Sequence, residues 1–173
     1  MDESGISLTP PVRRTWASMG QTPIIRTPFN AKRIESAMAA VLADASEAKV
    51  MFGGQPGADN DPNSITFMRQ LRHQLPGDKV TLIWRGPSSP AGREDALVPP
   101  SQRSWLVVER RGDYAPDLNA VEGLWSNLNG TQLANLCVDA IAETEYQARR
   151  GIRRIRREND LAFGFLRHTG LFL

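Results

Sequence analysis

The chain has 173 residues, a formal net charge of +2 and a pI near 9.0, so it has room for one domain with a proper core and permits a polyanionic partner without requiring one. Its single cysteine, Cys137, excludes a disulfide framework and a thiolate zinc site. No run of about 18 apolar residues exists to cross a membrane, and the acidic start is not a signal peptide, so we expect a cytoplasmic protein with no membrane partner.

The first third of the chain alternates turns with short apolar runs. Prolines and glycines break up residues 1–31, in which 13–16 and 22–26 could be short strands or parts of an irregular excursion. Residues 32–45 are ambiguous, because alanine favours helices whereas short apolar runs occur in both helices and strands. Residues 49–52 are typical of a strand that ends at two glycines.

The rest of the chain predicts a helix, two buried strands and a helical end. Asp61 or Asn63 can cap a helix whose apolar face repeats at helical spacing up to Leu75. Residues 79–84 and 105–109 are nearly continuous apolar runs, which favours buried strands in a parallel α/β core. A weak helix could lie between them, over residues 93–103. The carboxyl-terminal third predicts helices over 133–136, 140–157 and 161–166.

Residues 113–125 predict a strand exit, a proline turn and a helix start. Pro116 cannot continue a strand ladder. Asn119 is a good N-cap, and Glu122 follows it with the spacing of a capping box. The apolar residues that come next recur on one helix face, so Glu122 is expected on the first turn of a helix that packs on a sheet: Val121, Leu124, Trp125 and Leu128.

Four segments of the chain resemble the mariner-like insertion-sequence transposases of the DDE superfamily. The segment YAPDLNAVEGLWSNLNG, residues 114–130, resembles their carboxyl-terminal signature, whose glutamate is the last metal-binding carboxylate. Asp2-Glu3-Ser4-Gly5 resembles the element that carries their first catalytic aspartate. TPPVRRTWASMGQTP and LAFGFLRHTGL are also similar to this group. Ala120 departs from the signature, which has proline there; proline is favourable in a first helical turn but is not required.

The resemblance implies an α/β, ribonuclease-H-like fold, a mixed sheet flanked by helices. It implies one catalytic domain over residues 1–173 and a strand, not a helix, within 32–45. Since only Met1 precedes Asp2, we expect the first strand to be largely missing, together with the helix-turn-helix region. The chain is then a truncated, degenerate copy, or one whose true start lies upstream.

The resemblance also implies a chemistry and a partner. Enzymes of this superfamily cut and join transposon-end DNA with two divalent metals, Mg²⁺ or Mn²⁺, held by converging carboxylates. The implied catalytic and metal-binding residues here are Asp2 and Glu122. Whether the chain forms a homo-oligomer stays open.

Arg85 stands where the family has its middle aspartate, directly after the strand predicted over 79–84. A guanidinium offers no lone pair and cannot deprotonate. At about 4 Å and an effective dielectric constant near 20, it opposes a 2+ ion by roughly 8 kcal/mol. Asp78 lies at the other end of the strand, roughly 20 Å away, and Glu94 and Asp95 lie beyond a loop. We therefore expect Arg85 to abolish metal catalysis and to pair with Asp2 or Glu122.

Several arginines crowd one predicted helix and suggest phosphate binding. Arg149, Arg150, Arg153 and Arg154 are the candidate DNA contacts. The alternative is a solvated helix face balanced by nearby acids. At the level of function, the alternatives are a non-catalytic DNA- or partner-binding remnant, a product that never folds stably, and an α/β domain unrelated to DNA. The four tryptophans are expected to pack in the core, although Trp16, beside two arginines, could lie near DNA.

Overall fold

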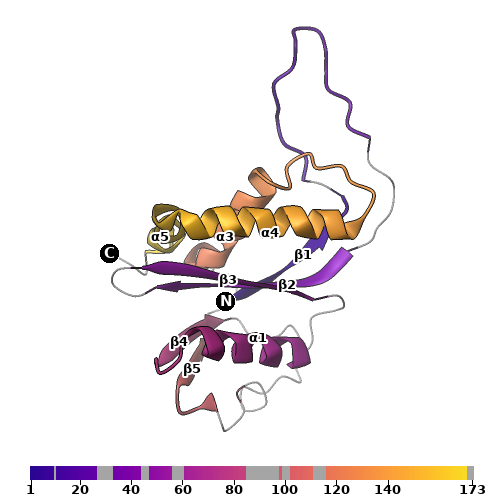
Figure 1. Cartoon of the computed structure of the whole chain (residues 1–173). Coiled ribbons are helices and arrows are strands. Elements are labelled where there is room, and N and C mark those ends of the chain that lie inside the picture. The colour runs from indigo at the N-terminus through magenta and orange to yellow at the C-terminus, as the bar shows by residue number, and fades with distance from the viewer. Residues whose placement is uncertain are drawn as a thin grey trace.

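The computed structural model describes residues 1–9, 11–26, 33–43, 47–55, 61–84, 98, 102–110 and 116–170. Arg85, Glu94, Asp95, residues 113–115 and most of the weak helix expected over 93–103 lie outside this set. The described chain forms three layers, with helices on both faces of a central sheet (Figure 1).

Two groups of strands form the middle of the molecule. Strands β1 (Asp2–Ser7), β2 (Arg33–Ala43) and β3 (Ala48–Gln55) make an antiparallel sheet in the order β1-β2-β3. Strands β4 (Val80–Trp84) and β5 (Leu106–Arg110) pair in parallel, as their continuous apolar runs and the crossover between them predict.

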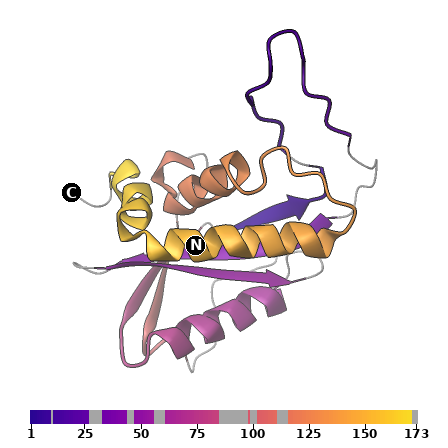
Figure 2. The ribbon, with the colours of Figure 1, turned by 45° about the horizontal axis from the view of Figure 1, so that its top comes forward.

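Helices cover the two faces of the sheet. α1 (Asp61–Gln74) lies with β4 and β5 on one face. The other face is covered by α3 (Ala120–Gly130), α4 (Ile141–Arg157) and α5 (Asn159–His168), with α4 lying along β3 (Figure 2). A one-turn 3-10 helix, η2 (Pro116–Leu118), leads into α3.

Each side of the sheet has its own apolar core. One core joins β1, β2 and β3 to α3, α4 and α5, and includes Leu124, Leu128 and Ile152. A second joins the sheet to α1, β4 and β5, and includes Met68, Leu71 and Trp84. The helices pack closely on the first side: a Cβ atom on Gly151 of α4 would lie only 2.4 Å from Leu128 Cδ2 of α3.

The ambiguous alanine-rich segment is a strand, as the resemblance implies. Ala37 and Ala39 face the core under α3, α4 and α5, whereas Ala40 faces the core over α1. Because both faces are buried, the segment shows no alternation of polar and apolar residues. Small side chains let the two helical layers approach this strand, which explains why helix propensity gives way to tertiary packing.

Several expectations for the helices and strands are confirmed. α1 buries Met68 and Leu71, and α3 begins after Asn119, whose side chain accepts a hydrogen bond from the Val121 amide. The four apolar residues expected on the buried face of α3 are the ones it buries: Val121, Leu124, Trp125 and Leu128. α4 and α5 match the helices expected over 140–157 and 161–166.

Other expectations are wrong. Residues 133–136 are turns, not a helix, since Asn135 adopts a left-handed φ of 54° that interrupts helical geometry. Trp16 is 99% exposed, on an irregular arm over residues 11–26 that projects from the body (Figure 1), so it does not pack in the core. The first strand is present from Asp2 onward, and β4 is buried on one face only, with Ile83 42% exposed.

The helices of the described part include none that is both long and apolar enough to cross a membrane.

Candidate functional site

The start of β1 meets the start of α3 through one side chain. Asn119 donates from Nδ2 to Asp2 Oδ2 at 2.8 Å, while its Oδ1 accepts from the Val121 amide at 3.2 Å. Asn119 is buried, at 8% exposure, so both bonds are sheltered from water. The N-cap of α3 therefore carries Asp2 directly against the first turn of the helix, which contains Glu122.

The carboxyl end of β4 meets the same start of β1. The Met1 amino group donates to the Ile83 carbonyl oxygen at 2.7 Å, and Trp84 donates from Nε1 to Glu3 Oε1 at 3.2 Å. Arg85 is covalently joined to Trp84, although Arg85 itself is outside the described residues. Three segments distant in sequence, at the start of β1, at the end of β4 and at the head of α3, thus converge.

The expected metal ligands do not form a complete set in the part of the chain that the structure describes. No group of three or more His, Cys, Asp or Glu side chains there could hold a metal ion. Asp2 already accepts a hydrogen bond from Asn119, and Glu3 accepts one from Trp84. Glu122 is exposed on the first turn of α3. With arginine following β4, these donors do not fit the two divalent metals that the resemblance implies.

Two residues of this region were not expected from the sequence as parts of a site. Asn119 was assigned only a capping role, yet it also binds Asp2. Glu3, which adjoins Asp2, bonds to the tryptophan that ends β4. The sequence around Asn119 predicts the cap but not the bond to Asp2, because Asp2 is distant in sequence.

The arginines of α4 divide into paired and unpaired groups. Arg149 forms an ion pair with Glu145 at 2.6 Å and lies over the Phe52 ring. Arg154 lies 3.5 Å from Glu158 and bonds to the side chain of Asn127 in α3. These two arginines follow the expected alternative, a helix face balanced by nearby acids.

Two other arginines of α4 are more accessible to a ligand. Arg150 and Arg153 are exposed; Arg153 lies over the Tyr146 ring, and Arg150 makes no ion pair within the described residues. Arg156 donates from Nε to the Val50 carbonyl oxygen at 2.8 Å, and desolvation by burial lowers the pKa of its guanidinium. Arg150 and Arg153 are thus the expected DNA contacts that remain open to a ligand.

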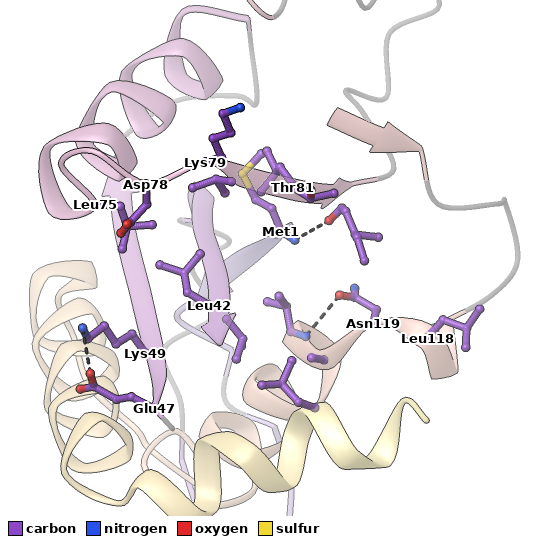
Figure 3. A pocket seen from close by; sticks show the side chains of 17 residues that line it. Met1, Leu42, Glu47, Lys49, Leu75, Asp78, Lys79, Thr81, Leu118 and Asn119 are labelled. Atoms are coloured by element: carbon purple, nitrogen blue, oxygen red, sulfur yellow. Dashed lines mark hydrogen bonds and ion pairs between the residues drawn. The ribbon is translucent and has the colours of Figure 1, made fainter. Parts of the chain in front are cut away.

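A cavity of about 610 Å³ lies beside this region but is not lined by Asp2 or Glu122. Figure 3 shows Met1 at one side of it, Thr81 on β4, Leu42 on β2 and Asn119 at the head of α3. Its lining also includes the charged residues Glu47, Lys49, Asp78 and Lys79.

The layers, the mixed strands and the meeting of β1 with β4 and α3 define a ribonuclease-H-like α/β fold, the class that the resemblance implies. Solved structures with this fold that resemble the chain include those of Mos1 transposase. They include a paired-end complex with the left transposon end, at TM-score 0.54 and 18% identity over 95% of this chain. The strand transfer complex matches at TM-score 0.55 and 16% identity over 98% of this chain.

A third Mos1 structure, a mariner paired-end complex with Mn, matches at TM-score 0.52 and 18% identity over 99% of this chain. The chain spans about half the length of these proteins, between 52% and 55%. No protein-family model matches the chain, and no curated protein does so either. At these identities the likeness concerns the fold.

Proposed function

We propose that the chain is the catalytic-domain part of a mariner-like DDE transposase, and that Arg85 has silenced metal-dependent DNA cleavage and strand transfer in it. In this proposal residues 1–173 belong to one such domain, Asp2 and Glu122 are the two surviving carboxylates, and transposon-end DNA is the ancestral substrate. The observation that supports it is the bond from Asn119 to Asp2 at 2.8 Å, which joins the start of β1 to the N-cap of α3, the helix whose first turn contains Glu122.

The position of β4 supports the role given to Arg85. Trp84, the residue before it, bonds to Glu3, the residue after Asp2. In the sequence Arg85 follows Trp84 directly. A permanent cation there neutralises carboxylates that would otherwise attract Mg²⁺ or Mn²⁺, since the charge of arginine cannot be relieved by deprotonation.

The proposal is tested by the thermal unfolding midpoint with and without Mn²⁺, followed by near-UV circular dichroism of the buried tryptophans Trp84, Trp105 and Trp125. We expect Mn²⁺ to leave the unaltered protein unchanged and to raise the midpoint of Arg85→Asp, because a ligand that binds only the folded state stabilises it. Arg85→Gln is the matched control, as it removes the cation without adding a carboxylate.

A rise with Mn²⁺ in the unaltered protein would contradict the silencing by Arg85. The absence of a rise in Arg85→Asp would contradict the assignment of the site itself. The triple change that adds Asp2→Asn and Glu122→Gln to Arg85→Asp should lose any rise that Arg85→Asp gains, which separates specific from surface binding of the ion.

A second candidate function is non-catalytic binding to DNA, which would let the chain compete with an active transposase. The observation that favours it is the exposure of Arg150 and Arg153 on the outer layer of helices. Binding of this kind should weaken steeply as salt rises, because it depends on phosphate contacts.

A further inference from the structure

The arm over residues 11–26 projects from the body and carries an exposed tryptophan (Figure 1). Trp16 is 99% exposed, whereas the other three tryptophans are buried: Trp84, Trp105 and Trp125. An indole is a large, mainly apolar side chain that is highly buried on average, and exposed indoles are enriched at interfaces. The Trp16 ring is therefore available to a partner.

Asn135 fixes the base of the arm to the body. Its side chain accepts from the Arg13 amide at 2.9 Å and donates to the Arg13 carbonyl oxygen at 2.9 Å, and its own amide donates to the Pro11 carbonyl oxygen at 3.0 Å. Asn135 makes these bonds from a left-handed φ of 54°, which is costly for a residue other than glycine. At the tip, the Gln21 amide donates to the Ser18 carbonyl oxygen at 2.9 Å. An arm ordered at its base and tip loses less conformational entropy when it binds a partner.

The arm is also basic. Arg13, Arg14 and Arg26 are exposed, and residues 11–26 contain no aspartate or glutamate. Three cations on so short a segment contrast with the net charge of +2 for the whole chain. Exposed apolar residues such as Ile24 would suit a protein surface, but cations beside an indole favour a partner that offers negative charge and a flat ring together. Nucleotides offer both.

We propose that the arm binds single-stranded DNA, with the Trp16 ring stacked on an unpaired base and with Arg13 and Arg14 on the flanking phosphates. A single strand is needed because stacking within a duplex covers the base faces, whereas an unpaired base presents its π-face to an aromatic ring. The chain spans at most about 3.6 Å per residue, so Arg14 lies within roughly 7 Å of Trp16 along the backbone and both can contact one nucleotide.

The inference goes beyond the proposed function, since it needs neither a metal ion nor the carboxylates of Asp2 and Glu122. It rests on the proposed function only for the choice of DNA over RNA.

The first measurement is the tryptophan fluorescence of the full chain, titrated with an oligothymidylate of about 12 nucleotides. A base stacked on an indole quenches the emission of the indole, and Trp16 is the exposed member of the four tryptophans. We expect saturable quenching in the unaltered protein and none in Trp16→Leu. Arg150→Ala should keep the quenching, which separates the arm from the candidate DNA contact on α4.

Fluorescence anisotropy of the labelled oligonucleotide measures the affinity without a tryptophan signal. Trp16→Leu should weaken binding roughly tenfold because the stacked ring is lost, and Trp16→Phe should retain most of the affinity. Ile24→Ala is the matched control, since Ile24 is an apolar residue of the same arm with 82% exposure, and it should change the affinity little. Arg13→Ala and Arg14→Ala should each reduce the slope of log affinity against log salt by about 0.7. The near-UV circular dichroism of the buried tryptophans should be the same in every variant, which shows that the core is intact.

Absence of quenching in the unaltered protein, or equal affinities for the unaltered protein and Trp16→Leu, would overturn the proposal. Equal affinity and equal quenching with a duplex of the same length would overturn the stacking on an unpaired base. Tighter binding of an oligouridylate would assign the arm to RNA instead. Loss of self-association in Trp16→Leu and Ile24→Ala, with unchanged affinity for the oligonucleotide, would assign it to a second copy of the chain. None of these readouts involves Mn²⁺, so their failure is distinct from a failure of the proposed metal site.

Discussion

The side-chain amide of Asn119 makes two hydrogen bonds with different structural roles. Its oxygen caps α3 and its nitrogen holds Asp2, so one residue fixes the angle between a strand start and a helix start. Aspartate caps a helix as well as asparagine does. However, aspartate cannot donate when ionised, and it would place a second negative charge beside Asp2. The contact to Asp2 can therefore be removed without removing the cap.

For this reason Asn119→Asp should lower the free energy of unfolding at neutral pH by about 1–3 kcal/mol, the cost of losing a charge-assisted bond. Urea unfolding at neutral pH measures this effect.

The exchanged pair Asp2→Asn with Asn119→Asp is the control, since it returns one donor and one carboxylate to the contact. It should recover most of the lost stability at neutral pH. No deficit in Asn119→Asp, or no recovery in the exchanged pair, would mean that the Asp2 contact contributes little.

At the scale of whole elements, β4 has one edge paired with β5 and, among the described residues, one edge without a strand partner. The Thr81 amide faces the open edge, whereas the Leu82 amide lies at the next position and faces β5. Proline is tolerated in a strand only where the missing N–H has no partner. Thr81→Pro should therefore cost less than about 1 kcal/mol, and Leu82→Pro about 3 kcal/mol or more, since it loses a ladder bond and a buried side chain.

Chemical denaturation of the two proline variants measures the difference. Equal losses for Thr81→Pro and Leu82→Pro would contradict the direction that we assign to these amides.

Sequence predicts an element well when its apolar residues repeat with the spacing of only one kind of secondary structure. In α3 the cap and the buried face agree, and helical spacing alone identifies Val121, Leu124 and Leu128. β2 needed the resemblance, because burial on both faces removes the alternation on which a strand prediction depends.

The turns at 133–136 were missed for another reason. A left-handed Asn135 leaves no pattern, and its side chain bonds to the distant backbone of Arg13. Likewise, the bond from Asn119 to Asp2 joins residues 117 positions apart. Contacts between residues so far apart in sequence depend on the whole fold, so the local spacing of apolar residues does not predict them.

For the molecule as a whole, the arrangement of charge matters more than its sum. The net charge is only +2, yet α4 forms part of the outer layer and carries its arginines toward its carboxyl-terminal end (Figure 2). Cations are favourable there because they complement the helix dipole, so their position alone does not require DNA. Arg149 and Arg154 are held by acids, whereas Arg150 and Arg153 remain exposed.

If the outer face of α4 binds DNA, Arg150→Ala and Arg153→Ala should each weaken binding to a mixed-sequence duplex, and each should reduce the slope of log affinity against log salt by about 1. Fluorescence anisotropy over a salt series measures both quantities. Arg149→Ala is the matched control on the same helix, and it should change the slope less because its charge is already paired with Glu145. Equal effects of all three changes would indicate a diffuse electrostatic contribution, and an unchanged slope in Arg150→Ala and Arg153→Ala would place any DNA contact elsewhere on the molecule.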